Sequence, residues 1–370
     1  MLRWSIKDTL SHAVKISVTL HDNTRTEGAT GEVRETKAGA ISPAETAIAK
    51  YAGRDLQSNR GIPLNLDWVN AVRVNSSAVE RRAQSLVTRR TVKKEWQAAW
   101  LLRAITCMDL TTLSGDDTEE RVLRLCAKAR QPLQQEIVQK LGVESLPIKV
   151  AAVCVYHSFV ETARRGVEGS GIHVAAASTG FPAGLSPLAE RVAEIRCSVE
   201  AGADEIDVVI TRAHVFGGKW RSLYDEIAMF KNACGPAHLK VILGTGDLLT
   251  LRNVARTSLV AMMAGADFIK TSTGKEPVNA TLPVSLVMTR AIREYAQETG
   301  MAVGFKPAGG IRTAKQSLDW LALMKEELGN PWLNAELFRF GVSGMLADIE
   351  RQLEHHATGR YSAEYRHPIA

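Results

Sequence analysis

The sequence contains few cysteines, and they are not arranged as a disulfide framework or a zinc site requires. It has five cysteines in 370 residues, an odd number, and no two of them share a Cys-x-x-Cys spacing. Both features argue against a disulfide-stabilised fold and against a structural metal site. Because disulfides persist mainly in oxidising compartments, and because we see no export signal, we expect reduced thiols in a cytoplasmic protein.

Long apolar runs and a strong excess of one charge are also missing. No apolar run approaches the roughly 20 residues of a membrane-spanning helix, so we expect no membrane span. Hydrophobic residues make up 45% of the chain and charged residues 23%, the balance of an ordinary globular protein. The net charge of +6 is mildly basic. It suits an anionic small substrate as well as a weak attraction to nucleic acid.

Residues 1–58 are poor in large apolar side chains. The stretch 23–40 is rich in Thr, Gly, Glu and Lys. It has too little apolar surface for burial to offset the conformational entropy that it would lose on ordering. We therefore expect a poorly ordered N-terminal tail over residues 1–58. A targeting segment in residues 1–20 is the alternative, but Asp8 and the lack of arginine enrichment count against it.

Residues 59–103 predict a helical extension. Asn75 or Ser76 can cap a helix that runs through Leu86, and a second helix begins near Thr91. A basic cluster accompanies these helices and consists of Arg81, Arg82, Arg89, Arg90, Lys93 and Lys94. Nucleic-acid binding is the more specific interpretation of this cluster, but basic helices are usually solvated faces. We expect the extension to pack on the main domain and expect no nucleic-acid partner.

Residues 104–360 alternate between short apolar runs and longer amphipathic stretches. The predicted strands are Ile105–Asp109, Val150–Tyr156, His173–Ala177, Glu205–Ile210, Leu239–Leu243, Phe268–Thr271, Val303–Lys306 and Leu337–Phe340. Eight strand-and-helix units in about 250 residues are typical of an α/β fold, the (β/α)8 or TIM barrel. A doubly wound sheet would need a Gly-rich fingerprint after its first strand, where this chain has Met108–Leu113. We predict the barrel, followed by a C-terminal tail at residues 361–370.

Two lysines stand at the ends of predicted strands. Lys270 follows the apolar pair Phe268–Ile269, and Lys306 precedes Gly309–Gly310. Barrel enzymes build their chemistry at the carboxyl ends of the strands. Burial disfavours an ammonium ion and so does a second ammonium nearby, so we expect each lysine to lower the pKa of the other. An amine of this kind can form a Schiff base near neutral pH.

The remaining predicted strand ends supply acids, hydroxyls and a glycine. They are Asp109, Tyr156, Thr179, Asp207, Thr245 and Gly341. Isolated acids and lysines in a barrel are often structural ion pairs, and only their joint position favours a catalytic site. Glycines follow the last two strands, at Gly309–Gly310 and Gly341–Gly344. Backbone N–H groups and a helix N-terminus at this place can bind a phosphate.

Four long segments resemble the deoxyribose-phosphate aldolase family. They are Met108–Leu113, Ala203–Val209, Asp267–Lys275 and Gly304–Thr313, in this order along the chain. The resemblance extends over about residues 60 to 360. Residues 64–115 look like the longer, eukaryotic-type branch of the family rather than the compact bacterial one.

The resemblance implies a class I aldolase that cleaves 2-deoxy-D-ribose 5-phosphate reversibly to D-glyceraldehyde 3-phosphate and acetaldehyde, without a metal or another cofactor. It implies that Lys270 forms the Schiff base, that Lys306 lowers the pKa of Lys270, and that Asp207 moves protons with a bound water. The residues that it places around the phosphate are Gly274, Lys275, Gly309, Gly310, Ser343 and Gly344. Those that it places at sugar hydroxyls are Asp109 and Thr273.

The chain departs from the family pattern at two places. Some members have two consecutive serines after the eighth strand, whereas this chain has Ser343–Gly344. Several relatives end in a tyrosine that reaches the site, and neither Tyr361 nor Tyr365 can be given that role from the sequence. Cys154, which aligns with a thiol near the aldehyde site of some relatives, is most often a packed apolar residue.

Two other functions stay open on the sequence. One is a Schiff-base barrel enzyme that acts on a different sugar phosphate, although a second phosphate pocket would need further basic strand-end residues. The other is a non-catalytic protein that binds RNA or a partner through the basic cluster. The oligomeric state is open as well, a homo-oligomer included.

Overall fold

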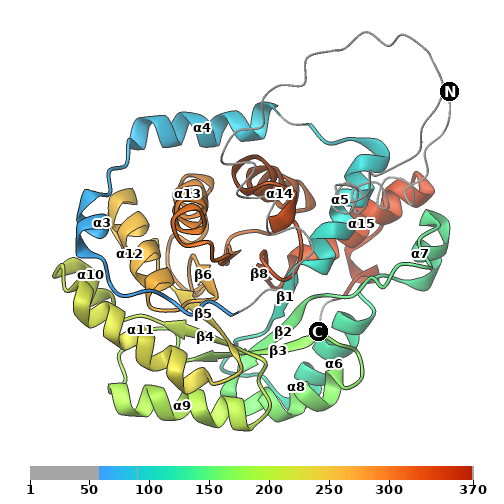
Figure 1. Ribbon diagram of the computed structural model, residues 1–370. Helices are drawn as coiled ribbons and strands as arrows, with labels where there is room; N and C mark the ends of the chain where they lie inside the picture. Colours follow the sequence, from blue (N-terminus) through green and yellow to red (C-terminus); the bar gives the residue numbers. More distant parts are fainter. Residues whose placement is uncertain (1–57, 90, 369–370) are drawn as a thin grey trace, which may run out of the picture.

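Eight parallel strands form a barrel around which the rest of the chain is wrapped (Figure 1). The computed structural model describes residues 58–89 and 91–368, so the tail expected at residues 1–58 lies outside the described part except for Ser58. The strands are β1 (Met108–Thr111), β2 (Ala152–Tyr156), β3 (His173–Ser178), β4 (Glu205–Val209), β5 (His238–Ile242), β6 (Phe268–Lys270), β7 (Gly304–Lys306) and β8 (Phe340–Val342).

The strands pair in the order β7-β6-β5-β4-β3-β2-β1-β8. Backbone bridges from Phe305 to Phe338 and from Ala308 to Gly341 join β7 to the β8 segment and close the ring. In register, Lys270 lies beside Lys306 across the β6–β7 pair, and Asp109 lies beside Gly341 across the β1–β8 pair. The predicted TIM barrel is confirmed.

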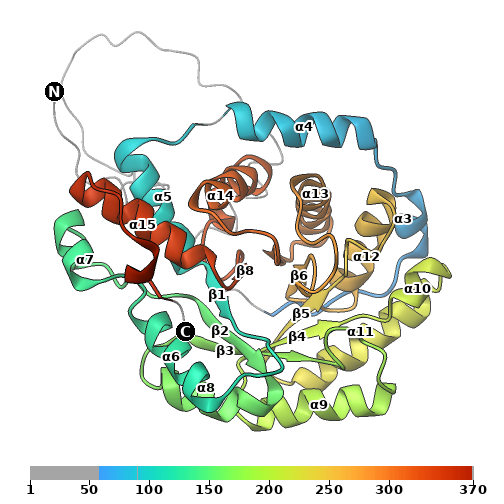
Figure 2. The same ribbon diagram turned by 180° about the vertical axis from the view of Figure 1, so that it is seen from behind.

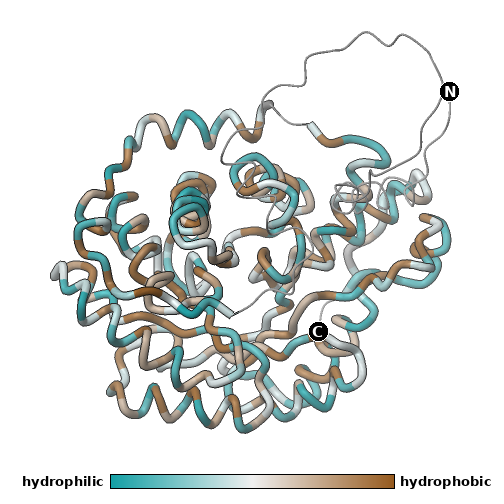
Figure 3. Tube along the Cα trace, in the orientation of Figure 1, coloured by the Kyte–Doolittle hydropathy of each residue, from teal (hydrophilic) through white to brown (hydrophobic). Residues whose placement is uncertain are grey.

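Helices follow the strands and cover the outside of the barrel (Figures 1 and 2). They are α6 (Glu119–Arg130), α7 (Gln135–Leu141), α8 (Val160–Val167), α9 (Leu188–Glu200), α10 (Arg212–Phe216), α11 (Trp220–Cys234), α12 (Leu251–Met263), α13 (Leu282–Thr299), α14 (Ala314–Leu328) and α15 (Met345–Thr358), with single 3-10 turns at His157–Phe159, Asn330–Trp332 and Glu364–Arg366. Hydrophobic residues concentrate on the strands and the inward helix faces, and hydrophilic ones on the periphery (Figure 3).

Threonine side chains start several of these helices. In each case the threonine hydroxyl accepts a hydrogen bond from a backbone N–H in the first turn, at Thr118, Thr250, Thr281 and Thr313. Such a cap satisfies an N–H group that has no partner within the helix, and it contributes about 1 kcal/mol. Gly300 ends α13 with a φ of 72°, a left-handed conformation that favours glycine. Local chemistry thus sets where the chain turns between strand and helix.

The helical extension consists of α3 (Leu66–Ala71), α4 (Ser76–Arg89) and α5 (Lys94–Thr106). Figure 1 shows α4 lying across the outer side of α13 and α14, and α5 lies against α14 and α15. Leu86, Leu101 and Leu102 are buried in these contacts. Within the basic cluster, Arg82 contacts Glu326 at 2.5 Å and Glu327 at 3.4 Å, so this arginine is committed to α14.

The first and last predicted strands are displaced in the structure. The expected strand at Ile105–Asp109 is wrong, because α5 continues to Thr106 and β1 starts at Met108. Ile105 continues the buried helical face of Leu101 and Leu102, and a short apolar run does not distinguish a buried helix turn from a strand. Strand β8 starts at Phe340 rather than Leu337, since the N–H groups of residues 337 and 338 both donate to the carbonyl of Asn334 in a turn.

Both ends of the described chain are held against the barrel. Asn59 is buried, and its side-chain amide donates to the carbonyls of Met262 and Ala266 at 2.8 Å each. At the other end, His367 is buried and its Nε2 lies 2.8 Å from Glu354 on α15. Within the described ranges, no helix combines the length and the hydropathy of a membrane span.

Candidate active site

The interior of the barrel is lined with charged side chains. Period-two alternation along β4 turns Glu205 and Asp207 to the same side of the sheet. Together with side chains from β1, β5, β6, β7 and the start of β8 they form a buried set, which we call the bore charges: Asp109, Glu205, Asp207, Lys240, Lys270, Lys306 and Arg339. Each of them is at most 3% exposed. Burying a charge is costly unless it is paired, and ion pairs connect all of these groups.

Lys270 is the member of the bore charges that reaches the cavity at the carboxyl ends of the strands. Its Nζ lies 2.7 Å from Oδ2 of Asp207. Burial lowers the pKa of Lys270, the nearby Lys306 lowers it further, and Asp207 only partly opposes this, so the pKa is below its ordinary value. A larger fraction of this amine is therefore uncharged at neutral pH than for a solvated lysine.

Lys306 lies next to Lys270 but has a different charge environment. Its Nζ lies 2.7 Å from Asp207 and 2.5 Å from Asp109. Burial lowers the pKa of Lys306, but these two carboxylates outweigh it and raise the pKa above its ordinary value. The expectation that the two lysines depress each other is thus wrong for Lys306. The effect runs one way: Lys306, whose own pKa is raised, lowers the pKa of Lys270.

Asp207 accepts hydrogen bonds from three amines. Oδ2 accepts from Lys270 and Lys306, and Oδ1 accepts from Lys240 at 3.0 Å. Burial raises the pKa of the carboxyl, but the three lysines reverse this and bring it well below the ordinary value. Asp207 is therefore a carboxylate that lies within hydrogen-bond distance of the Lys270 amine and can accept a proton there.

Asp109 lies deeper than the sequence predicted. It is the second residue of β1, which ends at Thr111, so Asp109 does not stand at the strand end. Its Oδ2 accepts from Lys306 and its Oδ1 accepts from Arg339 at 2.7 Å. Both oxygens are thus engaged within the bore. A contact between Asp109 and a sugar hydroxyl stays a prediction.

Above Lys270 lies a cavity of about 350 Å³ at the carboxyl ends of the strands. Its lining contains the predicted residues Lys270, Thr273, Gly274, Lys275, Gly309, Gly310, Ser343 and Gly344. Asp109, Asp207 and Lys306 are not among the lining residues, because they lie beneath Lys270 in the bore. The predicted site residues thus fall into two groups. One lines the open mouth, and the other, Asp109, Asp207 and Lys306, is buried beneath it.

Glycines shape two walls of this mouth. Gly274, Gly309 and Gly310 have φ values of 86°, 76° and 82°. Residues other than glycine adopt such positive φ values only at an energetic cost. A Cβ atom at Gly309 would also lie 2.7 Å from Cγ of Asn279. The N-terminus of α15 begins at Gly344 in the same lining, so free N–H groups and the helix dipole favour an anion there.

Glu276, which the sequence did not single out, lies in the loop after β6, next to the mouth residues Thr273 and Gly274. Its carboxylate accepts from the backbone N–H groups of Thr273 and Gly274 and, at 2.7 Å, from the Thr273 hydroxyl. The loop after β6 is therefore held by an internal carboxylate. The Thr273 hydroxyl is committed to it in this structure, and its contact with a sugar stays a prediction.

The sequence reasoning also missed Glu205, Lys240, Arg339 and the mouth residue Arg312. A usable signal exists for two of them. Lys240 interrupts the apolar run of β5, and Glu205 precedes Asp207 by two residues on β4, so both positions face the interior. Arg339 carried a weaker signal, because it lies between Phe338 and β8, just after the turn at residues 335–337, where the predicted strand and the observed one do not coincide.

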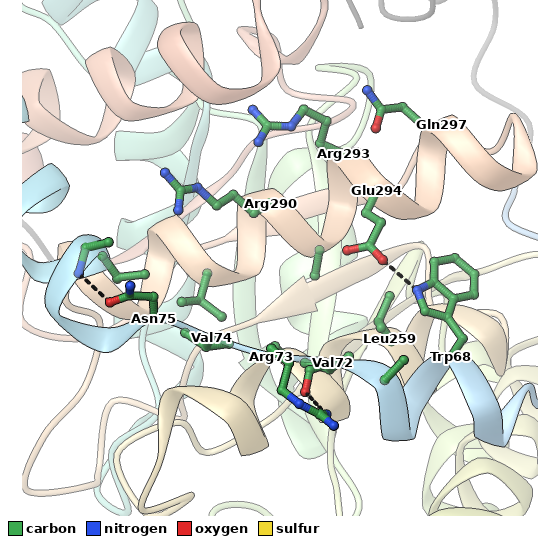
Figure 4. Close-up of a pocket in the computed structure, with 16 residues that line it drawn as sticks. Trp68, Val72, Arg73, Val74, Asn75, Leu259, Arg290, Arg293, Glu294 and Gln297 are labelled. Atoms are coloured by element: carbon green, nitrogen blue, oxygen red, sulfur yellow. Dashed lines mark hydrogen bonds between the residues drawn. The ribbon is translucent and has the colours of Figure 1, made fainter.

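A second cavity, of about 500 Å³, lies on the outside of the barrel between the α3–α4 connection and helices α12 and α13 (Figure 4). In it, the indole N–H of Trp68 donates to Glu294 at 2.6 Å. This cavity contains no residue from a strand end and no lysine. It lacks the amine chemistry of the mouth, which we therefore take as the candidate active site.

Among the described residues, no cysteine or histidine lines the mouth. Cys154 on β2 is fully buried, and burial raises the pKa of its thiol, so it is held in the protonated form. Tyr361 and Tyr365 are 83% and 84% exposed and follow α15, which runs about 20 Å away from the mouth. In the described residues, no three His, Cys, Asp or Glu side chains form a group that could hold a metal ion.

Comparison with known proteins identifies the family. Residues 103–346 match the model of the DeoC/LacD family aldolases. The chain is 58% identical to deoxyribose-phosphate aldolase of Mus musculus over 313 residues, which cover 84% of this chain and 98% of that protein. It is 57% identical to the Homo sapiens enzyme of the same name over 314 residues, with 84% and 99% covered.

The solved structures agree on the fold. A crystal structure of a putative deoxyribose-phosphate aldolase from Toxoplasma gondii matches 72% of this chain and 99% of that chain, with a TM-score of 0.59 and 24% identity. At this identity the likeness concerns the fold alone. The family resemblance that the four sequence segments indicated is confirmed by the family model and by the two mammalian relatives. The chain belongs to the DeoC/LacD family of aldolases, and it is a lyase.

Proposed function

We propose that the chain cleaves 2-deoxy-D-ribose 5-phosphate to D-glyceraldehyde 3-phosphate and acetaldehyde through a Schiff base on Lys270. The mammalian relatives, which bear the name deoxyribose-phosphate aldolase, support this substrate. The observation that carries the mechanism is the position of Lys270, whose lowered pKa makes it the one bore amine suited to nucleophilic attack in the mouth. We infer a role in the breakdown of deoxyribonucleotides and deoxyribose phosphates.

The reaction begins with the uncharged amine of Lys270. It attacks C1 of the open-chain sugar, and loss of water from the carbinolamine gives an iminium ion. Asp207, 2.7 Å from the amine, accepts and returns protons in these steps together with a water. The bond between C2 and C3 then breaks. Its electron pair moves through C1 to the iminium nitrogen, and the C3 hydroxyl loses its proton to become the aldehyde of D-glyceraldehyde 3-phosphate.

The second half releases acetaldehyde. The enamine left on Lys270 takes up a proton at C2, and water then attacks C1 and frees the amine. Lys306 stays protonated throughout and makes the formation of a second ammonium beside it less favourable. Every step runs in reverse with the same groups, so the geometry supports both cleavage and synthesis.

The phosphate of the substrate would occupy the outer part of the mouth. Gly274, Gly309 and Gly310 line it without side chains, and α15 starts at Met345, directly after Gly344, with first-turn N–H groups that have no partner within the helix. Lys275 and Ser343 add a charge and a hydroxyl. Arg312 is the other basic side chain of the lining. This cluster suits a single phosphate, which favours a sugar monophosphate over a bisphosphate.

The direct test is covalent trapping. Incubation with acetaldehyde followed by borohydride reduction should add one ethyl group to the protein, and peptide mapping should place it on Lys270. Lys270→Ala should abolish both the mass increase and the cleavage of 2-deoxy-D-ribose 5-phosphate. Cleavage that survives in Lys270→Ala, or a label on another lysine, would contradict the mechanism. Comparing turnover on fructose 1,6-bisphosphate separates this function from that of another Schiff-base barrel enzyme.

Three further proposals concern the chain as a whole. We infer a cytoplasmic location, which is supported by five cysteines that are all free thiols. We infer a homo-oligomer, in view of Leu185, Phe216 and Leu249, which are 76%, 51% and 83% exposed in the segments that follow β3, β4 and β5. Sedimentation of the full chain measures this. RNA binding through the basic cluster is not favoured, because Arg82 is paired with α14.

A further inference from the structure

We propose that Lys240 is a positioning residue for the aldol chemistry: with Glu205 and Arg339 it balances the charges of the bore, so that no carboxylate is left to hold Lys270 as an ammonium ion. This inference rests on the proposed Schiff-base function of Lys270. Lys240 and Arg339 are fully buried and neither lines the mouth, so they act through Asp207 and Asp109 rather than on a substrate.

The bore charges form a continuous chain of ion pairs from one end of the barrel to the other. At the amino end, Glu205 accepts from Arg339 at 2.7 Å and contacts Lys240. Arg339 also donates to Asp109 at 2.7 Å. Lys240 continues the chain to Oδ1 of Asp207 at 3.0 Å, and Oδ2 of Asp207 meets Lys270 at the mouth. The groups remote from the mouth are thus linked to Lys270 by direct contacts.

Among its lysine, arginine and carboxylate groups, the charges of this chain balance when Lys270 is neutral; His173, hydrogen-bonded to Glu205 at the amino end, adds a positive charge only when it is protonated. The carboxylates are Asp109, Glu205 and Asp207, and the cations besides Lys270 are Lys240, Lys306 and Arg339. A protonated Lys270 would be a fourth cation for three carboxylates in a dry interior. Because an excess charge in such a medium is expensive, the composition of the bore favours the free amine.

Lys240 has the central place in this balance. Lys240 contacts both Glu205 and Oδ1 of Asp207, and its Nζ lies 3.6 Å from Asp109. Without it, Asp207 would face only Lys306 and Lys270, and the carboxylates would outnumber the remaining cations. Both effects favour the ammonium form of Lys270. The groups that face Lys270 itself are Asp207, Lys306 and Cys154, and none of them can replace the missing charge.

Burying the charges of Glu205, Lys240 and Arg339 is unfavourable for the stability of the fold, and this supports a functional role for them. Buried ion pairs lose solvation that their mutual attraction often does not recover, and apolar replacements of similar volume are often as stable or more so. A barrel interior filled by branched apolar side chains is the usual solution. Here Glu205, Lys240 and Arg339 occupy positions that Val, Met and Leu could fill, beneath the mouth and out of reach of a substrate.

The test measures how imine formation depends on pH. The full-length protein and its variants are equilibrated with acetaldehyde at a series of pH values, quenched with borohydride, and the trapped fraction is read by intact mass. Lys240→Met should shift the midpoint upward by about one pH unit or more, which is the effect of one charge at close range. Lys240→Arg, which keeps the charge, should leave the midpoint within a few tenths of a unit of the unaltered protein.

Two more variants separate charge from structural damage. Glu205→Gln removes an anion, so its midpoint should move downward, opposite to Lys240→Met. The double variant Lys240→Met with Glu205→Gln restores the balance and should return the midpoint toward that of the unaltered protein. Arg191→Met is the matched control, since Arg191 forms an equally buried pair with Glu226 at 2.5 Å outside the bore. It should lower the melting temperature without moving the midpoint.

The possible outcomes are distinct. Opposite shifts in the two single variants, with recovery in the double variant, support the inference. It is overturned if folded Lys240→Met keeps the original midpoint, or if Glu205→Gln shifts it in the same direction as Lys240→Met. Should Lys240→Met not fold, Glu205→Gln and Lys240→Arg still decide the direction. If the unaltered protein is not labelled at Lys270 at all, the proposed function itself fails, and this inference fails with it.

Discussion

Lys270 and Lys306 share one carboxylate oxygen, because the Nζ atoms of both lie 2.7 Å from Oδ2 of Asp207. Lys306 has a second carboxylate, Asp109, at 2.5 Å, whereas Lys270 has Asp207 alone as its ion-pair partner among the described residues. This asymmetry shifts the pKa values of the two neighbouring amines in opposite directions. It is the basis on which we propose Lys270 as the nucleophile and Lys306 as a fixed charge.

Replacing Lys306 with Leu should raise the pKa of Lys270. The change removes a cation next to Lys270 and leaves Oδ2 of Asp207 to the Lys270 ammonium alone. We expect the midpoint of imine trapping to rise by about one to two pH units, with activity at neutral pH reduced by at least about tenfold and partly regained in alkali. Lys306→Arg keeps the charge and is the control. An unchanged midpoint in Lys306→Leu would show that Lys306 does not set it.

Gly344→Ser tests the departure from the two-serine pattern. A Cβ at Gly344 meets no atom within 4 Å, and its φ of −93° suits any residue. The added hydroxyl can donate to a phosphate, and a hydrogen bond to a charged group is worth about 1.5–3 kcal/mol. We expect KM for 2-deoxy-D-ribose 5-phosphate to fall about tenfold or more. Turnover of 2-deoxy-D-ribose without the phosphate should stay the same, and an equal change for both sugars would place the effect elsewhere.

Gly309→Ala should damage the mouth. Its φ of 76° disfavours a side chain, and the new Cβ would lie 2.7 Å from Cγ of Asn279. We expect a loss of about 1–3 kcal/mol in the free energy of unfolding and a raised KM, measured by denaturant titration and initial rates. Gly344→Ala, which introduces the same methyl group without a clash or a positive φ, is the matched control. Equal stability of the two variants would show that the Gly309 backbone is unstrained.

His173 should make stability depend on pH. A hydrogen bond to Glu205 raises the pKa of His173 above its ordinary value, against the effects of burial and of Arg339. A group whose pKa is raised by folding stabilises the folded state below the unfolded-state pKa, and this contribution is lost as the pH rises through the folded-state pKa. The melting temperature of the unaltered protein should therefore exceed that of His173→Gln at about pH 5.5, and the difference should shrink by about pH 8.5. A difference that grows with pH would contradict the sign.

The packing of the helical extension can be tested at Leu101. This side chain is 1% exposed on α5, which lies against α14 and α15. Leu101→Ala should cost about 2–5 kcal/mol of unfolding free energy, the range for a buried leucine in a core. Leu66, 42% exposed on α3, is the control, and Leu66→Ala should change stability by less than about 1 kcal/mol. If Leu101→Ala is as harmless as its control, the extension is not part of the folded core.

Much of the fold was contained in local patterns. The alternation of short apolar runs with amphipathic stretches predicted the barrel, and the caps at Thr118 and Thr313 start helices close to where the amphipathic pattern begins. The errors lie at β1 and β8. There the apolar residues Ile105 and Leu337 belong to a helix end and to a turn, because tertiary packing rather than periodicity decides a run of a few residues.

The sequence by itself determined which residues carry the proposed chemistry. Lys270, Asp207 and the glycines of the mouth lie at or just after strands that the sequence pattern predicts. The carboxyl ends of all strands of a barrel meet on one face, so residues at these ends can be expected to lie together. Only the tertiary structure decided the charge of each group. The pKa of a buried amine depends on carboxylates that approach from other strands. The two carboxylates that contact Lys306 are far from it along the chain: Asp109 is 197 residues away and Asp207 is 99 residues away.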